Sequence, residues 1–298
     1  MTAENGAGQV RITILGSGSS GGVPRIGGHW GKCDPAEPRN RRRRCSLLIE
    51  GFKDHRPPEN GPNEQNNGQR EENVTRVLVD TAPDMREQLI DAGVGWLDGV
   101  FYTHAHADQA HGIDDLRVVA INGRRRVDVY MDTPTAEILT QRFDYCFETP
   151  PGSPYPPVLQ VFPLTALTPV TVDGPGGGVT ASPFLQEHGS IMSLGFRVGN
   201  IAYSSDISDI PGESIPALEG LDCWIVDALR RDPHPSHAHL DTTLEWLERF
   251  KPRLGVLTNL HVDMDYRTLC AELPDNVIPA YDGMVIDVPE PVTCTGPR

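Results

Sequence analysis

Hydrophobic and polar positions along the chain predict many short strands separated by a few helices. Residues 10–15 alternate apolar and polar side chains, and apolar runs of strand length recur as far as residue 288. Helices are predicted where Pro134 opens the segment 133–142 and where apolar side chains share one face of 241–250. We expect strands at 10–15, 45–52, 74–79, 100–102, 127–131, 158–163, 167–172, 179–186, 193–198, 201–204, 221–227, 253–258, 277–280 and 284–288. We expect helices at 83–92, 113–122, 133–142, 241–250 and 266–272, and a loop at 143–157.

Metal-binding side chains crowd the segment that follows the predicted strand 100–102. His104, His106, Asp108 and His111 lie within eight positions, and the chain has ten histidines in all. Imidazole and carboxylate groups are the donors that zinc and manganese take in proteins. A metal site is therefore predicted here, against the alternative that each histidine is an unrelated surface or core residue.

Two later strands end in the same way. The predicted strand 179–186 runs into His188, and the strand 201–204 runs into Asp206, with small residues beside each. Both side chains are therefore further predicted metal ligands.

The segment from His104 to Gln109 resembles the HxHxDH signature of the metallo-β-lactamase superfamily, with Gln109 in place of the last histidine. The glycine-rich loop GSGSSGGVPR at residues 16–25 resembles the first loop of the branch that contains PhnP-type phosphodiesterases and tRNA 3′-end endonucleases. The resemblance implies an αββα sandwich, in which two mixed sheets face one another with helices outside. It covers nearly the whole chain, so we expect one domain over residues 1–298.

The same resemblance implies which side chains hold the metals. His104, His106 and His188 would hold metal one, Asp108 and His261 would hold metal two, and Asp206 would bridge the two ions. Two divalent ions, zinc or manganese, are therefore expected.

Two positions next to these ligands are also assigned by resemblance. Asp80, at the end of a predicted strand, is implied to orient the metal loop. Gln109 offers only an amide oxygen, a weaker donor than imidazole, and His111 is the alternative ligand. Either choice predicts a weaker second site.

A third group of histidines lies in the loop at residues 230–240. His237 is the first choice, and His239 the second, for a residue that contacts the substrate phosphate or protonates a leaving oxygen. His234 is expected in solvent. The predicted catalytic set is Asp108, His237 and His239, together with the bound metals.

The net charge of −15 comes from 26 basic and 41 acidic residues and argues against a broad nucleic-acid surface. Five arginines nevertheless occupy residues 39–44. A charge run is usually a solvated loop edge, but a phosphate clamp made by four of these arginines is an equal alternative. The four arginines are Arg41, Arg42, Arg43 and Arg44.

The remaining composition bears on location and shape. Residues 53–73 are polar and rich in proline, asparagine and glycine, which predicts a mobile insertion. No charged-then-apolar leader and no apolar run near 18 residues occurs, so a cytoplasmic protein without a membrane segment is expected. A homodimer is an open option.

The resemblance implies hydrolysis of a small cyclic phosphate or a nucleotide-type phosphodiester by a metal-bridging hydroxide. Three alternatives stay open. A tRNase Z-like nuclease would use the same chemistry on RNA, a lactonase or thioesterase would share the metal site, and a nucleotide-binding protein could carry a weakened second site without catalysis.

Overall fold

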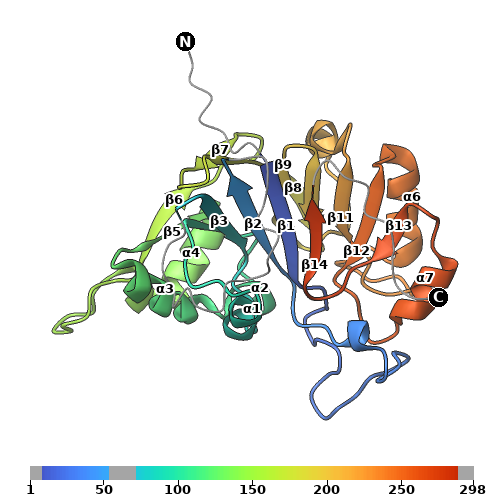
Figure 1. Ribbon diagram of the computed structural model, residues 1–298, viewed down its shortest axis with the longest axis horizontal. Coiled ribbons are helices and arrows are strands. Elements are labelled where there is room, and N and C mark those ends of the chain that lie inside the picture. Colours follow the sequence, from blue (N-terminus) through green and yellow to red (C-terminus); the bar gives the residue numbers. More distant parts are fainter. Residues whose placement is uncertain (1–8, 54–71, 288–298) are drawn as a thin grey trace. The chain divides into compact units, whose positions relative to one another are not determined.

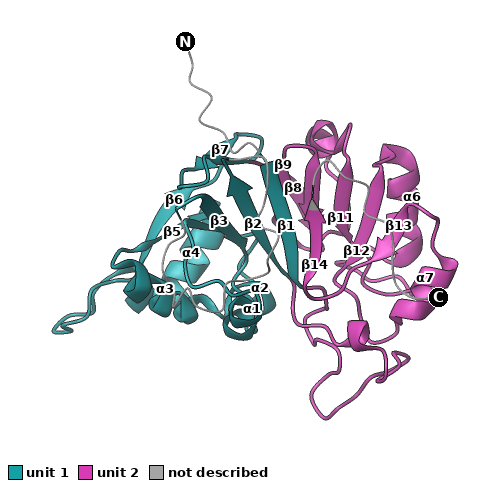
Figure 2. Cartoon of the chain, viewed as in Figure 1, with its two compact units in different colours: residues 1–15, 46–180 teal, residues 16–45, 181–298 magenta. Residues whose placement is uncertain are grey.

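The computed structural model describes residues 9–53 and 72–287 (Figure 1). Apart from residues 53, 72 and 73, the predicted mobile insertion lies outside the described residues. The chain forms two compact units, each built from two segments (Figure 2). Unit 1 consists of residues 1–15 and 46–180, and unit 2 consists of residues 16–45 and 181–298. The single-domain organisation stays a prediction.

Unit 1 contains a mixed sheet with strands in the order β1-β2-β3-β4-β5-β6. Strands β2 and β3 are antiparallel, whereas β3, β4, β5 and β6 run parallel. Parallel strands place their carboxyl ends at one edge of a sheet, so the segments after β3 and β4 lie together. The elements are β1 (Gln9–Gly16), β2 (Ser46–Phe52), β3 (Val74–Val79), α1 (Met85–Asp91), β4 (Gly99–Phe101), α2 (Ala107–Ala110), η2 (Ile113–Asp115), α3 (Leu116–Gly123), β5 (Val127–Met131), α4 (Thr133–Arg142), α5 (Asp144–Phe147), β6 (Leu159–Pro163) and β7 (Val170–Val172).

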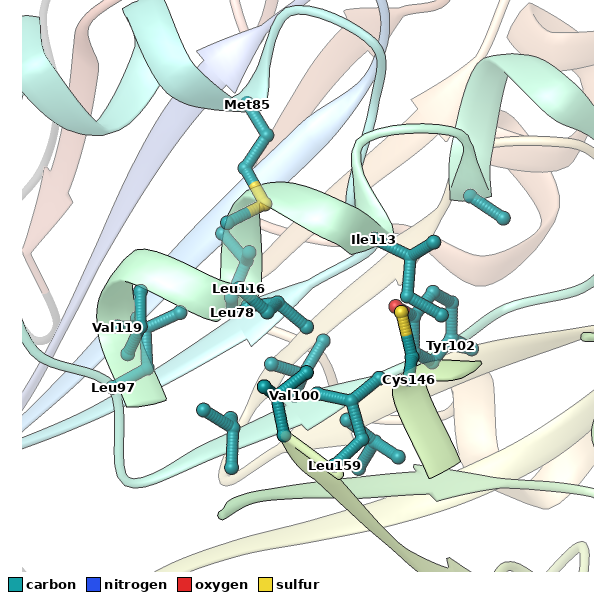
Figure 3. Close-up of a cluster of buried hydrophobic side chains, with 14 of the residues drawn as sticks. Leu78, Met85, Leu97, Val100, Tyr102, Ile113, Leu116, Val119, Cys146 and Leu159 are labelled. Carbon is teal, nitrogen blue, oxygen red and sulfur yellow. The ribbon is translucent and has the colours of Figure 1, made fainter. Parts of the chain in front are cut away.

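The core of unit 1 packs strands β3 and β4 against the helices that follow them (Figure 3). Leu78 and Val100 are fully buried, and Leu116 of α3 packs in the same cluster. The buried Tyr102 hydroxyl is hydrogen-bonded to Thr81 at 3.0 Å. Burial of apolar side chains on both sides of the β4 end fixes the segment that carries His104.

Unit 2 contains a second mixed sheet with the order β13-β12-β11-β10-β9-β8. Strands β10, β11, β12 and β13 are parallel, while β9 is antiparallel to both β8 and β10. Strands β8, β10, β11 and β12 therefore all end at one edge of this sheet. The elements are η1 (Pro38–Asn40), β8 (Val179–His188), β9 (Ile191–Val198), β10 (Ile201–Ser204), η3 (Gly212–Leu218), β11 (Cys223–Asp227), α6 (Leu240–Phe250), β12 (Leu254–Thr258), α7 (Tyr266–Glu272), β13 (Val277–Pro279) and β14 (Met284–Asp287).

Two mixed sheets accompanied by helices confirm the predicted αββα fold class. Most predicted elements appear within two residues of their expected ends. The segment 143–157 is the main exception, because it contains the short helix α5 where a loop was expected. Cys146 of α5 is buried, and Phe143 and Phe147 pack on the core of unit 1. This hydrophobic packing explains the helix.

The loop at residues 16–45 is held to helix α7 by a buried acidic residue. Glu37 is 1% exposed and contacts Arg39 at 2.7 Å and Arg267 at 2.6 Å. Burial alone would raise the pKa of Glu37, but the hydrogen bonds from these two arginines outweigh it and lower the pKa to about 2.

We expect Glu37→Gln to lower stability at neutral pH and to have a smaller effect in acid. The pKa of Glu37 falls from 4.5 to about 2 on folding, so its stabilisation is present above pH 4.5 and is lost as the pH falls toward 2. Urea unfolding midpoints of the wild type and the variant, measured at several pH values, check this. An equal difference at neutral and acidic pH would contradict it.

Candidate metal centre

The metal motif of unit 1 starts from the carboxyl ends of strands β3 and β4. Asp80 follows β3 with φ 64° and is fully buried. It accepts hydrogen bonds from the backbone nitrogen and the hydroxyl of Thr103, each at 2.8 Å. The predicted orienting role of Asp80 fits this contact, because Thr103 comes directly before His104.

Thr103 also fixes the ring of His104. Its hydroxyl donates its one hydrogen to Asp80, so it accepts a hydrogen bond from Nδ1 of His104 at 3.0 Å. The nitrogen that would face a metal is then Nε2. His104 is 2% exposed, and the ring of His106 lies 4.5 Å away, centroid to centroid. The donor chemistry of unit 1 therefore fits a divalent ion.

We expect Thr103→Val to lower metal affinity about 10- to 100-fold, because it removes the hydroxyl that bonds both Asp80 and Nδ1 of His104, while the backbone bond to Asp80 stays. Competition with a metal chelator measures the affinity. Thr180→Val is the matched control, since Thr180 is exposed and its hydroxyl bonds the hydroxyl of Thr171. Equal affinities for the two variants would contradict an orienting role.

The other predicted positions in unit 1 lie on or beside α2. Asp108 is half-buried and Gln109 is buried. His111 is exposed, and its ring packs edge-on against Phe143 with 5.6 Å between centroids. Whether Gln109 or His111 binds metal stays a prediction.

Unit 2 brings three side chains together at the edge where β8, β10 and β11 end. One ligand atom from each of His188, Asp206 and His237 lies within 4.8 Å of the others. Nδ1 of His188 donates to the carbonyl oxygen of Ser236 at 2.6 Å, which makes Nε2 the nitrogen that would face a metal. His188 and Asp206 therefore offer further donors to a divalent ion, and His237 lies beside them.

Asp227, the last residue of β11, is an important residue that sequence reasoning missed. Its Oδ2 lies 2.7 Å from Nδ1 of His237, and its Oδ1 has no hydrogen-bond partner among the described residues. Burial raises the pKa of Asp227 to about 7, although His237 acts in the opposite direction. The available signal was a carboxylate at the end of a buried strand, as with Asp80 and Asp206.

The other histidines of the 230–240 loop differ in their surroundings. His234 is half-buried with its ring 5.1 Å from that of His237, so the expectation that it lies in solvent is wrong. Burial lowers its pKa, and the nearby positive groups lower it further. His239 is the residue that precedes α6, and its Nδ1 contacts the Thr242 hydroxyl at 2.9 Å.

His261 follows strand β12 and contacts two charged residues. Its Nδ1 lies 2.5 Å from Oδ1 of Asp263, and its Nε2 contacts Nη2 of Arg25. The nitrogen that the superfamily resemblance would assign to metal two thus faces a guanidinium. The fit of His261 to a metal is therefore poorer than that of His188.

The four arginines of the predicted phosphate clamp lie in different environments. Arg42 is 2% exposed, with its guanidinium bonded to Asn40 at 3.3 Å and to Cys33 at 3.8 Å. Its burial overturns a substrate role for Arg42, because a substrate cannot reach it. Arg43 bonds Asp282 through Nε at 3.2 Å. For the exposed Arg41 and the half-buried Arg44, phosphate binding stays a prediction.

A family model described as the beta-lactamase superfamily domain matches residues 75–259. A curated octanoyltransferase of Porphyromonas gingivalis is 30% identical over 284 residues, which cover 92% of this chain and 51% of that protein. The chain thus spans about half the length of the curated relative it matches. Within the described residues, no helix is long and apolar enough to cross a bilayer.

Two solved structures extend these similarities. A diphosphatase from the PhnP family is 30% identical with a TM-score of 0.77, and the alignment covers 94% of this chain and 97% of that one. The short form of human tRNase Z shares the fold at 18% identity and a TM-score of 0.57, over 94% of this chain and all of that one (100%). The chain therefore belongs to the metallo-β-lactamase superfamily of metal-dependent hydrolases, in its PhnP-like branch.

Proposed function

We propose that this protein is a metal-dependent phosphodiesterase that hydrolyses a small cyclic phosphate or nucleotide-type phosphodiester. The cluster of His188, Asp206 and His237 is the observation that carries the proposal, because it combines metal donors with a histidine held by a buried carboxylate. The 30% identity to a protein described as a PhnP-family diphosphatase supports phosphate chemistry.

The proposal assigns metal binding to His104, His106, His188 and Asp206, as the superfamily resemblance implies. Zinc or manganese is the proposed ion, in accordance with the mixture of imidazole and carboxylate donors. A divalent ion held there supplies Lewis acidity toward a phosphoryl oxygen and lowers the pKa of bound water.

His237 is assigned the role of protonating the leaving group. Hydrolysis adds water across a P–O bond, so the departing oxygen must gain a proton. Nδ1 of His237 points to Asp227 at 2.7 Å, which leaves Nε2 to carry the proton to that oxygen. Asp227 is then a positioning residue that holds the ring and stabilises its protonated form.

Asn259 adds a second contact to the same ring. Its amide nitrogen donates to the carbonyl oxygen of Ser205 at 2.9 Å and lies 3.2 Å from Nδ1 of His237. Ser205 precedes Asp206 in the chain. Because Nδ1 of His237 donates to Asp227, it cannot also accept from Asn259, so the Asn259 bond to Ser205 is the contact that holds the loop before Asp206.

A substrate panel with added zinc or manganese tests the proposal. We expect the wild type to cleave bis(p-nitrophenyl) phosphate and cyclic nucleotides, and Asp206→Ala to lose this activity. Asp275→Ala is the matched control, because Asp275 is exposed and remote from the β10 end in sequence.

Further substrates separate the alternatives. An octanoyl thioester and a lactone test acyl hydrolysis, and a precursor tRNA tests nuclease activity. Cleavage of the thioester or lactone without cleavage of any phosphodiester would overturn the proposal. Cleavage of the precursor tRNA alone would favour a nuclease.

A further inference from the structure

We infer that Arg25, rather than a second metal ion, occupies Nε2 of His261 and supplies a positive charge that binds the substrate phosphate. The inference rests on the proposed phosphodiesterase function for the identity of the anion. It concerns the second ion that the superfamily resemblance implies, for which this chain has an altered donor set.

The contacts of His261 define the state of its ring. Nδ1 donates a hydrogen bond to Oδ1 of Asp263, because a carboxylate can only accept. Nε2 then carries a lone pair, which accepts a hydrogen bond from Nη2 of Arg25. One lone pair cannot serve a guanidinium and a metal together, so Arg25 and a metal compete for the same nitrogen.

The backbone places this contact beside His237. The backbone nitrogen of His261 donates to the carbonyl oxygen of Leu229 at 2.9 Å. The backbone nitrogen of Leu229 in turn donates to the carbonyl oxygen of Ala238 at 3.0 Å. Ala238 directly follows His237 in the chain. The Arg25–His261 pair therefore lies at the same edge of the unit 2 sheet as the proposed general acid.

The glycine-rich loop that precedes Arg25 is shaped to hold its side chain. A Cβ on Gly21 would lie 3.3 Å from both Cγ and Nε of Arg25, so glycine allows the side chain to lie close to the loop. Arg25 also opens a tight turn, in which its carbonyl oxygen accepts from the nitrogen of Gly28 at 3.0 Å. This turn fixes the backbone of Arg25, and the side chain extends from it so that the guanidinium contacts His261.

The charge of Arg25 is available to an anion. Arg25 is exposed, and across residues 9–53 and 72–287 it makes no ion pair with a carboxylate. The bond to His261 uses one of the five N–H groups of the Arg25 guanidinium. The other four can form the forked pair of hydrogen bonds that a phosphate accepts. Most other arginines of this loop are committed elsewhere, as Arg39 is to Glu37 and Arg43 to Asp282.

The donors implied for the second metal differ from the superfamily pattern. The superfamily pattern has a histidine at position 109, where this chain has Gln109. With one donor weakened in this way and another engaged by Arg25, we expect one tightly bound ion per chain. The guanidinium provides the second positive charge without a second ion.

Metal counting tests the inference independently of activity. The full chain is saturated with zinc or manganese, freed of weakly bound metal by dialysis, and analysed for metal per chain by elemental mass spectrometry. We expect one ion in the wild type and the same number in His261→Ala. Two ions in the wild type, or a lower number in His261→Ala, would overturn the inference.

Binding of inorganic phosphate to the metal-loaded protein tests the role of Arg25. We expect Arg25→Ala to weaken phosphate at least about 10-fold, because a charge-assisted contact is lost, and His261→Ala to weaken it in the same direction. Lys32→Ala is the matched control, as Lys32 is exposed in the same loop and bonds Val262 only through its backbone. Equal affinities for Arg25→Ala and Lys32→Ala would overturn the inference.

Neither measurement uses a hydrolysed substrate, so the two proposals can fail separately. One ion per chain together with Arg25-dependent phosphate binding, but no phosphodiester cleavage, would remove the proposed function alone. Thermal melting of each variant confirms that a lost affinity does not reflect unfolding.

Discussion

We expect His237→Ala to lower the kcat of phosphodiester hydrolysis about 10²- to 10⁴-fold, the range for loss of a general acid. The side chain lies next to His188 and Asp206 and is held by the buried Asp227. Because His237 lies beside the proposed metal ligands and is held by Asp227, it is the proposed donor of the proton that the leaving oxygen requires. Steady-state kinetics on the wild type and the variant measure the effect.

The leaving group separates acid catalysis from metal binding. A p-nitrophenolate departs without a proton, whereas an alkoxide of the kind released from a cyclic nucleotide needs one. We therefore expect the loss in His237→Ala to be much larger with the cyclic nucleotide, with metal content unchanged. Equal losses on both substrates, accompanied by loss of the ion, would instead make His237 a metal ligand.

Asp227→Asn examines the support of the same ring. It keeps the size of the side chain but removes the charge that stabilises protonated His237, so it should reproduce part of the defect without displacing metal. A larger loss in His239→Ala than in His237→Ala would move the general acid to His239.

Local sequence pattern was sufficient to predict most of the strands and helices, whereas their arrangement in an αββα sandwich came from the family resemblance. The strand Val127–Met131 and the helix Thr133–Arg142 have the predicted bounds. The alternation of buried and partly buried side chains marks the strand, and Asp132 caps the helix by accepting from the Thr135 nitrogen at 3.0 Å. These signals act over a few residues, which is why they can be recognised without the structure.

Local pattern was insufficient where a partner lies far away in the chain. The charge run at 39–44 predicts solvent exposure or a phosphate clamp, yet Arg42 is buried because Asn40 and Cys33 accept its hydrogen bonds. Arg25 ends the segment GSGSSGGVPR on which the resemblance rests, but its contact with His261 could not be predicted, since the two residues are 236 positions apart. Asp227 was visible only as a strand-end acid, and its role required the position of His237.

The strand ends that hold these residues depend on the core of unit 2, and Trp224 is central to it. Trp224 lies on β11, is fully buried and donates from Nε1 to the Ser204 hydroxyl of β10 at 3.0 Å. Its ring stacks on Trp246 at 6.3 Å and meets Phe250 edge-on at 5.5 Å. Helix α6 is thereby packed onto two strands that end in the site.

We expect Trp224→Ala to lower the free energy of unfolding by about 3–5 kcal/mol, because it removes this packing and leaves a cavity. Such a loss is a large part of the roughly 5–15 kcal/mol that stabilises a typical domain. Trp224→Phe retains an aromatic ring but loses the hydrogen bond to Ser204, so it should have the smaller effect.

Urea unfolding of wild type, Trp224→Ala, Trp224→Phe and Ser204→Ala gives the comparison. Ser204→Ala removes only the hydroxyl and should cost about 1–3 kcal/mol, because the buried indole N–H of Trp224 loses its acceptor. If Trp224→Ala were no less stable than Ser204→Ala, the indole would contribute only its hydrogen bond. The α6 packing would then not be what keeps the ends of β10 and β11, and with them Asp206 and Asp227, in place.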